Sequence, residues 1–328
     1  MQTIDKAALL REAQTLYREF NSEQKQIVQN KQIASIYTAN RWLYLLDLLG
    51  KHDHYVDQYL AKTPNLKGYF IGFTIFYYFL MIFGSGILAG DFGWGFLPIL
   101  ILWLLPVIPW VWYSTHSSTR LRRMDLANYF RDYAYPVLVH LREESKPDQS
   151  VDLKVFMKNV SQSKYRTGIP HLKAQEKTIR SGVEQKFYEC DLMALKTQLA
   201  DGSLIDYQLS LLIRERMRYK RKGNKYKLQV RAVHQLVVAM PKKQYQVANS
   251  TSTRNRHLAV QFLEKEKRHI FKIKNVAQIY VTKTAYKGNY YEEYKKLDAL
   301  LGKDRVFAVD TFVNMLGEAY RRAKPQAT

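Results

Sequence analysis

The residues best suited to chemistry are cations that alternate with apolar side chains in two neighbouring segments. Apolar residues occupy the odd positions from Ile205 to Ile213, and in the next segment they occupy the even positions from Tyr226 to Val238. This alternation predicts two β-strands, each with one buried face. The opposite face of the predicted hairpin carries six candidate anion-binding residues: Arg214, Arg216, Arg218, Lys220, Lys227 and Arg231.

A two-residue turn at 223–224 sets the expected register of this hairpin, because an even loop keeps both apolar faces on one side. In that register Arg216 faces Arg231, and Lys220 faces Lys227. Like charges directly opposite one another destabilise a sheet, so a bound anion would relieve them. The alternative is that these cations keep an exposed strand face soluble and protect it from unwanted pairing.

One acidic residue, Glu215, interrupts the apolar face, and His234 occupies the same face at a diagonal position in the expected register. Together they could form a buried acid/base pair with mutually shifted pKa values. The alternative is an ordinary satisfied structural contact, which the lack of a neighbouring nucleophile or metal partner favours.

Other candidate chemistry is sparse. His52, Asp53 and His54 are consecutive, so they do not converge on one metal ion, and a capping or solvent-exposed role is favoured. The only cysteine, Cys190, lies in a predicted strand as a small buried hydrophobe. Nucleotide-binding glycine loops and paired metal-binding motifs are missing from the sequence. We therefore expect no enzyme activity, no cofactor and no metal.

Net charge points to an anionic partner. The 328 residues include 51 Lys and Arg against 29 Asp and Glu, a net charge of +22. Almost all of this excess follows Arg120. Such a surface attracts anionic lipid headgroups, nucleic acid or phosphorylated small molecules.

Two uncharged stretches, 68–89 and 92–113, are each 22 residues long. A helix of about 20 apolar residues crosses a bilayer, so these stretches predict a transmembrane hairpin. The alternative is a pair of buried helices in a soluble core. Four glycines at four-residue spacing would let the helices pack closely, within the hairpin or in an oligomer. These are Gly68, Gly72, Gly86 and Gly90.

Basic residues flank both outer ends of the predicted hairpin. Lys62 and Lys67 precede it, whereas Arg120, Arg122 and Arg123 follow it. The positive-inside rule then places both termini in the cytoplasm. We therefore expect an integral two-pass protein of a bacterial inner membrane or an equivalent membrane.

The elements around the hairpin predict an α+β membrane protein. Residues 1–66 form a helical arm, 67–115 the hairpin, 116–150 a juxtamembrane helix and linker, and 151–328 a basic cytoplasmic domain. In that domain an odd loop at 201–203 adds a third strand to an antiparallel meander. Helices are expected at 291–301 and 310–322.

These features suggest three functions. The first is a membrane-anchored, non-enzymatic scaffold, expected to be a homo-oligomer, whose basic domain binds anionic lipid headgroups or, less favoured, nucleic acid. The second is a sensor in which a nucleotide-like phosphorylated ligand rearranges the hairpins. The third is an enzyme that uses Glu215.

Overall fold

The structure is a computed structural model that describes residues 6–62, 72, 74–76, 79, 117–158, 160, 172–180, 183–219, 224–247, 258–282, 285–286, 290–301 and 306–326. The chain divides into two compact units. The first comprises Met1–Phe20 and Lys51–Asp125, and the second comprises Asn21–Gly50 and Leu126–Thr328.

The first unit is helical in its described part. It contains α1 (Lys6–Glu19), the second half of α3 (Ala39–Ala61) and α7 (Ser117–Met124). Residues one turn apart on these helices meet in a small apolar core. Its buried members are Leu9, Ala13, Val56, Tyr59 and Leu121.

The second unit begins with α2 (Ser22–Asn30) and β1 (Gln32–Thr38). Asn21 and Gln24 cap the start of α2 reciprocally, at 2.8 and 2.9 Å. Lys31, with a φ of 54°, ends the helix in the left-handed region. Residues 32–38, expected within the helical arm, form a strand because their β-branched and aromatic side chains suit a sheet and Ile33 is buried there.

A nine-stranded sheet forms the centre of this unit. Its main path runs β1-β2-β4-β5-β6-β9-β8, while β3 pairs with β4 and β10 pairs with β6. All the pairings among the described strands of this sheet are antiparallel. A separate pair joins β7 (Tyr245–Val247) to β11 (Ala323–Pro325). The sheet strands are β2 (Ser150–Phe156), β3 (Leu172–Arg180), β4 (Val183–Gln198), β5 (Leu204–Arg218), β6 (Lys225–Pro241), β8 (Leu258–Glu264), β9 (Arg268–Val281) and β10 (Ala285–Tyr286).

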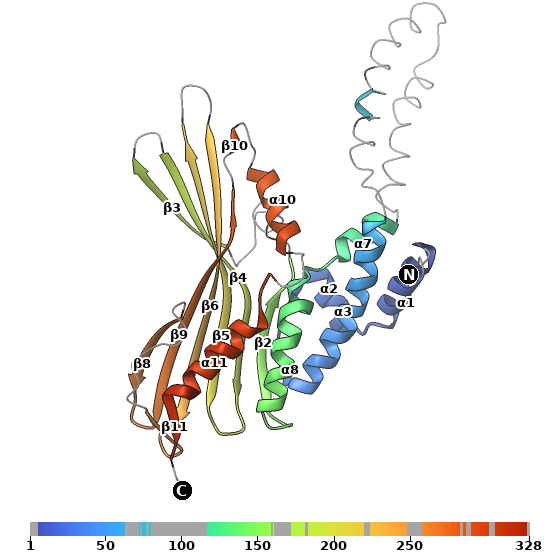
Figure 1. Cartoon of the computed structure of the whole chain (residues 1–328). Helices are drawn as coiled ribbons and strands as arrows, with labels where there is room; N and C mark the ends of the chain where they lie inside the picture. The colour runs from blue at the N-terminus through green and yellow to red at the C-terminus, as the bar shows by residue number, and fades with distance from the viewer. Residues whose placement is uncertain are drawn as a thin grey trace, which may run out of the picture. The chain divides into compact units, whose positions relative to one another are not determined.

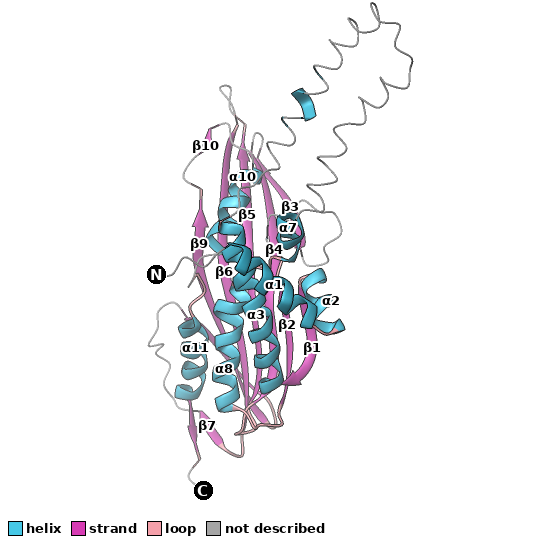
Figure 2. Cartoon of the chain, turned by 90° about the vertical axis from the view of Figure 1, so that its right-hand side faces the viewer, coloured by secondary structure: helices cyan, strands magenta, loops and turns pink. Residues whose placement is uncertain are grey.

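Helices cover one face of this sheet (Figures 1 and 2). A π-helical turn (Phe130–Ala134) leads into α8 (Tyr135–Glu144), and α10 (Tyr290–Leu301) and α11 (Val309–Arg322) follow the strands. α11 packs on β6, β9 and α8, while α10 packs on β6. The single juxtamembrane helix expected within 116–150 is instead two separate helices, α7 and α8, and Pro136 lies in the first turn of α8, directly after the π-helical turn.

The alternation predicted for β5 and β6 sets which face the helices cover. Odd positions of β5 and even positions of β6 are buried, among them Tyr207, Leu209, Leu236 and Val238. Phe312 of α11 lies against Tyr207, with ring centroids 5.1 Å apart. The core of the second unit therefore lies between this apolar face and the helices.

The structure corrects the predicted membrane topology. Among the described helices, none is both long and apolar enough to cross a membrane. The longest, α3, has 23 residues but carries charges such as Arg41, Asp47 and Lys51, which are costly in hydrocarbon. The predicted α+β membrane fold, two-pass location and cytoplasmic placement of both termini are therefore wrong by this finding. The fold supported is α+β, built on an antiparallel sheet.

The segments 68–89 and 92–113 lie outside the described residues, apart from residues 72, 74–76 and 79. Gly68, Gly86 and Gly90 are therefore not described. A methyl group added at Gly72 would meet nothing within 4 Å in the part that the structure describes.

Asp201, in the loop between β4 and β5, fastens three elements together. Its carboxylate accepts hydrogen bonds from the N–H and hydroxyl of Ser203 at 2.8 and 2.9 Å. It also accepts one from the Tyr245 hydroxyl at the start of β7 and one from the Tyr320 hydroxyl on α11, both at 2.6 Å. Burial opposes ionisation of Asp201, but the hydrogen bonds from these tyrosines and Ser203 outweigh it and hold its pKa below the ordinary value.

We expect Asp201→Ala to lower the free energy of unfolding by about 2–4 kcal/mol at pH 7, because it removes charge-assisted hydrogen bonds. Since the folded carboxyl has a depressed pKa, its stabilising effect is full above the unfolded pKa and is lost as the pH falls through the folded value. The difference between variant and wild type should therefore shrink in acid, as measured by urea denaturation.

The matched control is Asp206→Ala on the same hairpin, where an exposed carboxylate lies 3.1 Å from Lys196. An exposed ion pair contributes at most about 1 kcal/mol. Equal losses in the two variants would contradict the role assigned to Asp201.

Candidate anion-binding face

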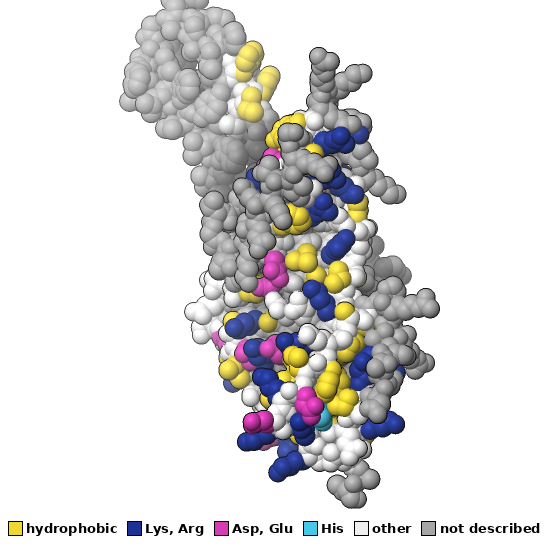
Figure 3. All heavy atoms as spheres, turned by 90° about the vertical axis from the view of Figure 1, so that its left-hand side faces the viewer, with side chains coloured by type: hydrophobic (Ala, Val, Ile, Leu, Met, Phe, Trp, Pro, Cys, Tyr) yellow, Lys and Arg dark blue, Asp and Glu magenta, His cyan; other side chains and the backbone are white. Residues whose placement is uncertain are grey.

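The sheet face opposite the helices carries the predicted cations. Even positions of β5 and odd positions of β6 point to it. Figure 3 looks onto this side and shows Lys and Arg side chains spread along it between hydrophobic ones. We call the cations of β5 and β6 on this face the basic strip: Arg214, Arg216, Arg218, Lys225, Lys227 and Arg231.

The register of the hairpin differs from the expected one. Arg216 pairs with Lys227, and Arg218 pairs with Lys225. Arg231 lies opposite Leu212 rather than Arg216, so the partner of each β5 residue shifts by four positions. An even shift leaves every side chain on its predicted face, which is why the face was predicted correctly and the pairs were not. Lys220 lies outside the described residues.

Two cross-strand pairs of like charge result. Directly opposite residues of an antiparallel pair have Cα atoms about 4.5–5.5 Å apart, so the two members of each pair repel. Arg216, Arg218 and Lys227 are exposed. Among the described residues, Arg216 and Lys227 form no ion pair with an acid. Their repulsion is therefore uncompensated within the part of the chain that the structure describes.

Arg214 is held more firmly than its neighbours. Its Nη2 donates to Gln185 at 3.1 Å, and its guanidinium lies 5.8 Å from the centre of the Phe187 ring. The buried Nε has no hydrogen-bond partner among the described residues. This N–H is enclosed by protein, so it is a buried unsatisfied donor and not a group open to a ligand from solvent.

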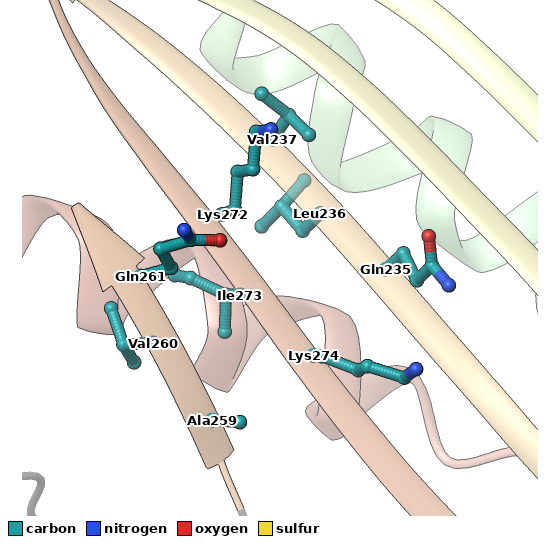
Figure 4. Close-up of a pocket in the computed structure, with 9 residues that line it drawn as sticks. All are labelled: Gln235, Leu236, Val237, Ala259, Val260, Gln261, Lys272, Ile273 and Lys274. Atoms are coloured by element: carbon teal, nitrogen blue, oxygen red, sulfur yellow. The ribbon is translucent and has the colours of Figure 1, made fainter. Parts of the chain in front are cut away.

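Two shallow hollows extend the same face toward the other end of the sheet. One, of about 370 Å³, lies on β6, β9 and β8, and Figure 4 shows Lys272 and Lys274 beside Gln235 and Gln261 there. The other, of about 460 Å³, lies on the opposite side of Val237 and includes Lys196. Lys272 and Lys274 were not predicted as anion-binding candidates from the sequence, although they alternate with the buried Phe271 and Ile273.

Glu215 and His234 are both buried, but the structure does not bring them together. Glu215 pairs with Leu228, whereas His234 pairs with Leu209. Six residues along a strand separate them by about 20 Å. The predicted acid/base pair is absent because it required the expected hairpin register, and the observed register differs from that one by four residues.

Each of the two groups has its own tyrosine partners. Tyr294 of α10 donates to Glu215 at 2.8 Å, and Tyr188 donates at 3.4 Å. His234 Nδ1 lies 2.7 Å from the Tyr207 hydroxyl, which is in turn hydrogen-bonded to Tyr133. Burial lowers the pKa of His234 to about 4. These contacts satisfy buried polar groups and hold helices to the sheet.

The remaining candidates lie in the first unit or are inert. His52 packs against the rings of Tyr17 and Phe20, and burial lowers its pKa to about 4. His54 is exposed and bonds Gln58, so the His52-Asp53-His54 run does not converge. Burial raises the pKa of Cys190 to about 12, which keeps it a thiol.

Three acidic side chains of the first unit, Asp53, Asp57 and Asp125, have carboxylate oxygens within 4.8 Å of one another. Sequence alone gave no signal for this cluster because Asp125 is remote in the chain. Arg120, Arg122 and Arg123 belong to α7 of the same unit, and Arg120 and Arg123 are exposed.

Comparison with known proteins finds no matching family model, no matching curated protein and no matching solved structure. The functional argument therefore depends on the geometry of the basic strip and its surroundings.

The buried His234 generates a prediction about pH. The imidazole has a pKa of 6.5 in the unfolded chain and about 4 in the folded one. Its contribution to the free energy of unfolding is therefore complete above pH 6.5 and is lost as the pH falls toward 4. The loss is on the order of 3 kcal/mol. We expect His234→Gln, which can still accept from Tyr207, to remove this part of the pH dependence of unfolding.

The control is His140→Gln, at an exposed position of α8. It should leave the difference in unfolding free energy between pH 7 and pH 4 unchanged. Burial also lowers the pKa of His52, in the first unit, so His52 affects unfolding over the same pH range. Each His234 or His140 variant, which keeps His52, is therefore compared with the wild-type chain. An unchanged pH profile for His234→Gln would show that this imidazole does not titrate as described.

Proposed function

We propose that this chain is a non-enzymatic binding protein whose basic strip binds phosphate groups, first of all those of anionic lipid headgroups. The observation that carries the proposal is one directly opposed pair of cations, Arg216 and Lys227, neither of which forms an ion pair with an acid among the described residues. Such pairs destabilise a sheet, and a bound anion between them removes that cost.

The spacing of the basic strip suits phosphate. Cations repeat at about 5 Å across the strands and about 7 Å along each strand, so one phosphate lies within reach of two or more of them. Guanidinium groups add bidentate hydrogen bonds that an ammonium group lacks. Three of the six members of the strip are arginines on alternate positions of β5.

Apolar side chains next to the strip favour a lipid surface over a soluble anion. Leu212, opposite Arg231, is 39% exposed, and Val276 on β9 is 44% exposed. Basic and apolar groups on one face suit the boundary between headgroups and acyl chains. This contact is peripheral, and it requires no helix that spans the bilayer.

Single-stranded nucleic acid is less favoured because it usually stacks its bases on exposed aromatic rings. Tyr219 lies near the strip, but its hydroxyl donates to Glu184 at 3.0 Å, and its position in the alternation directs it to the other face. The ring of Phe187, on the neighbouring strand β4, already lies under the guanidinium of Arg214.

The proposal is tested with the full chain and sedimented vesicles of phosphatidylcholine, with or without phosphatidylglycerol. We expect binding only to the anionic vesicles. Arg216→Glu with Lys227→Glu should weaken it at least about tenfold, because each surface cation contributes about 1 kcal/mol. The matched control, Lys243→Glu with Lys265→Glu, makes the same change in net charge at exposed loop positions and should retain most of the binding.

Two further measurements identify the source of the phosphate. A single-stranded RNA oligonucleotide and a soluble nucleotide are added as competitors of the vesicles. Equal losses in the strip variant and the control would reduce the effect to net charge and reject the site. Strip-dependent binding of RNA or nucleotide without binding of anionic vesicles would reject the lipid assignment.

A further inference from the structure

Among the described strands, the sheet ends at β8, and the outer edge of β8 pairs with no other described strand. β8 is the last strand of the main path and pairs with β9 alone among the described strands. Figure 1 shows it at the outer margin of the sheet. Exposed edges present unpaired backbone groups, and proteins usually protect them with charged residues, proline or a covering element.

The sequence of β8 lacks this protection. Its seven residues contain one charged side chain, Glu264, which is already bonded to Lys242 at 2.6 Å. The strand contains no cation, although the chain has a net charge of +22. Phe262 is 39% exposed on it. β8 is therefore an edge strand without cations in a strongly basic protein.

The hairpin bond fixes which backbone groups of β8 point outward. The Lys265 N–H donates to the Arg268 carbonyl at 3.0 Å, so residues 265 and 268 form a hydrogen-bonded pair. Such pairs alternate along an antiparallel ladder, and the β8–β9 ladder has no register shift. Odd residues of β8 therefore bond β9, and the even ones direct their N–H and C=O away from it.

We infer that β8 pairs with β8 of a second copy of this chain, antiparallel and about a two-fold axis at Gln261. In this register Val260 faces Phe262 of the other copy, and Leu258 faces Glu264. These are the even residues whose backbone groups point outward, so about eight hydrogen bonds form across the axis. A self-complementary contact of this kind closes as a dimer.

Repulsion between the two basic copies does not oppose this pairing. Among the described residues, the cations next to β8 on the exposed face are Lys265, which follows the strand, and Lys272 and Lys274 on β9. In the dimer two β8 strands separate the two β9 strands, a distance of about 14 Å, which exceeds the Debye length at physiological salt. The apolar pair of Val260 and Phe262 is buried without bringing the described cations of the two β9 strands together.

The opposite edge is a poorer choice for this contact. β1 follows α2 directly, and the Tyr37 hydroxyl of β1 is hydrogen-bonded to Glu23 of α2. Arg41 also lies over the Tyr37 ring, 3.9 Å from its centre. Contact of β1 with β8 of another copy would also be head-to-tail and would propagate rather than close.

The test uses Gln261→Cys in the full chain. Residue 261 faces its own copy across the axis in a non-hydrogen-bonded pair, with Cα atoms about 4.5 Å apart, a distance that a disulfide spans. Cys190 is buried, so the new thiol is the one available for oxidation. We expect mild oxidation to convert most of the variant to a covalent dimer on a non-reducing gel.

Ala259→Cys is the matched control, because residue 259 is exposed on the same strand and the same face. In the inferred register it lies about 14 Å from its copy and cannot form a disulfide. Equal cross-linking of the two variants would indicate random collision and overturn the inference. Failure of Gln261→Cys to cross-link would overturn it as well.

A second measurement does not depend on oxidation. Val260→Pro removes one outward N–H and leaves the bonds from β8 to β9 in place, as proline permits on an edge strand. Analytical ultracentrifugation should give a dimer mass for wild type and a monomer mass for this variant, with matching circular dichroism spectra. A monomer mass for wild type, or an unchanged dimer mass for the folded variant, would contradict the paired edge.

Discussion

The strict alternation of side chains along β5 and β6 is the constraint on which the second unit depends. Because every second residue of these long strands is apolar, one face of the sheet must be covered, and α8, α10 and α11 cover it. The cations then have only the other face to occupy. Packing of the core and exposure of the basic strip are thus two results of one pattern, and a shift by a single residue would exchange them.

Sequence indicated this pattern but not the pairing. Parity alone defined the faces of β5 and β6, and it was correct. The register depended on which residues form the turn, and the choice of 223–224 displaced each partner by four positions. That error created the opposition of Arg216 with Arg231 and the proximity of Glu215 to His234, neither of which exists. β1 was missed because it runs directly into α3, so its apolar residues were assigned to the helical arm, and its partner β2 is remote in the chain.

The membrane prediction had a different origin. It followed from two uncharged stretches, which lie largely outside the described residues, and the described helices do not support it. The polar contacts of the core were also beyond sequence reasoning. Tyr133, Tyr207 and His234 come from a helical turn and two strands, and Glu215 meets Tyr294 from a helix far along the chain. No local spacing reports contacts of this kind.

The place of α11 in the chain has a consequence for folding. This helix covers β6 and β9, yet it follows both of them in sequence, and Asp201 holds its Tyr320 from a loop more than a hundred residues earlier. During synthesis the apolar side of the sheet therefore emerges from the ribosome before its cover does. Until α11 arrives, that surface is exposed to other hydrophobic chains, and a nascent chain stalled before Val309 would be a natural substrate for chaperones.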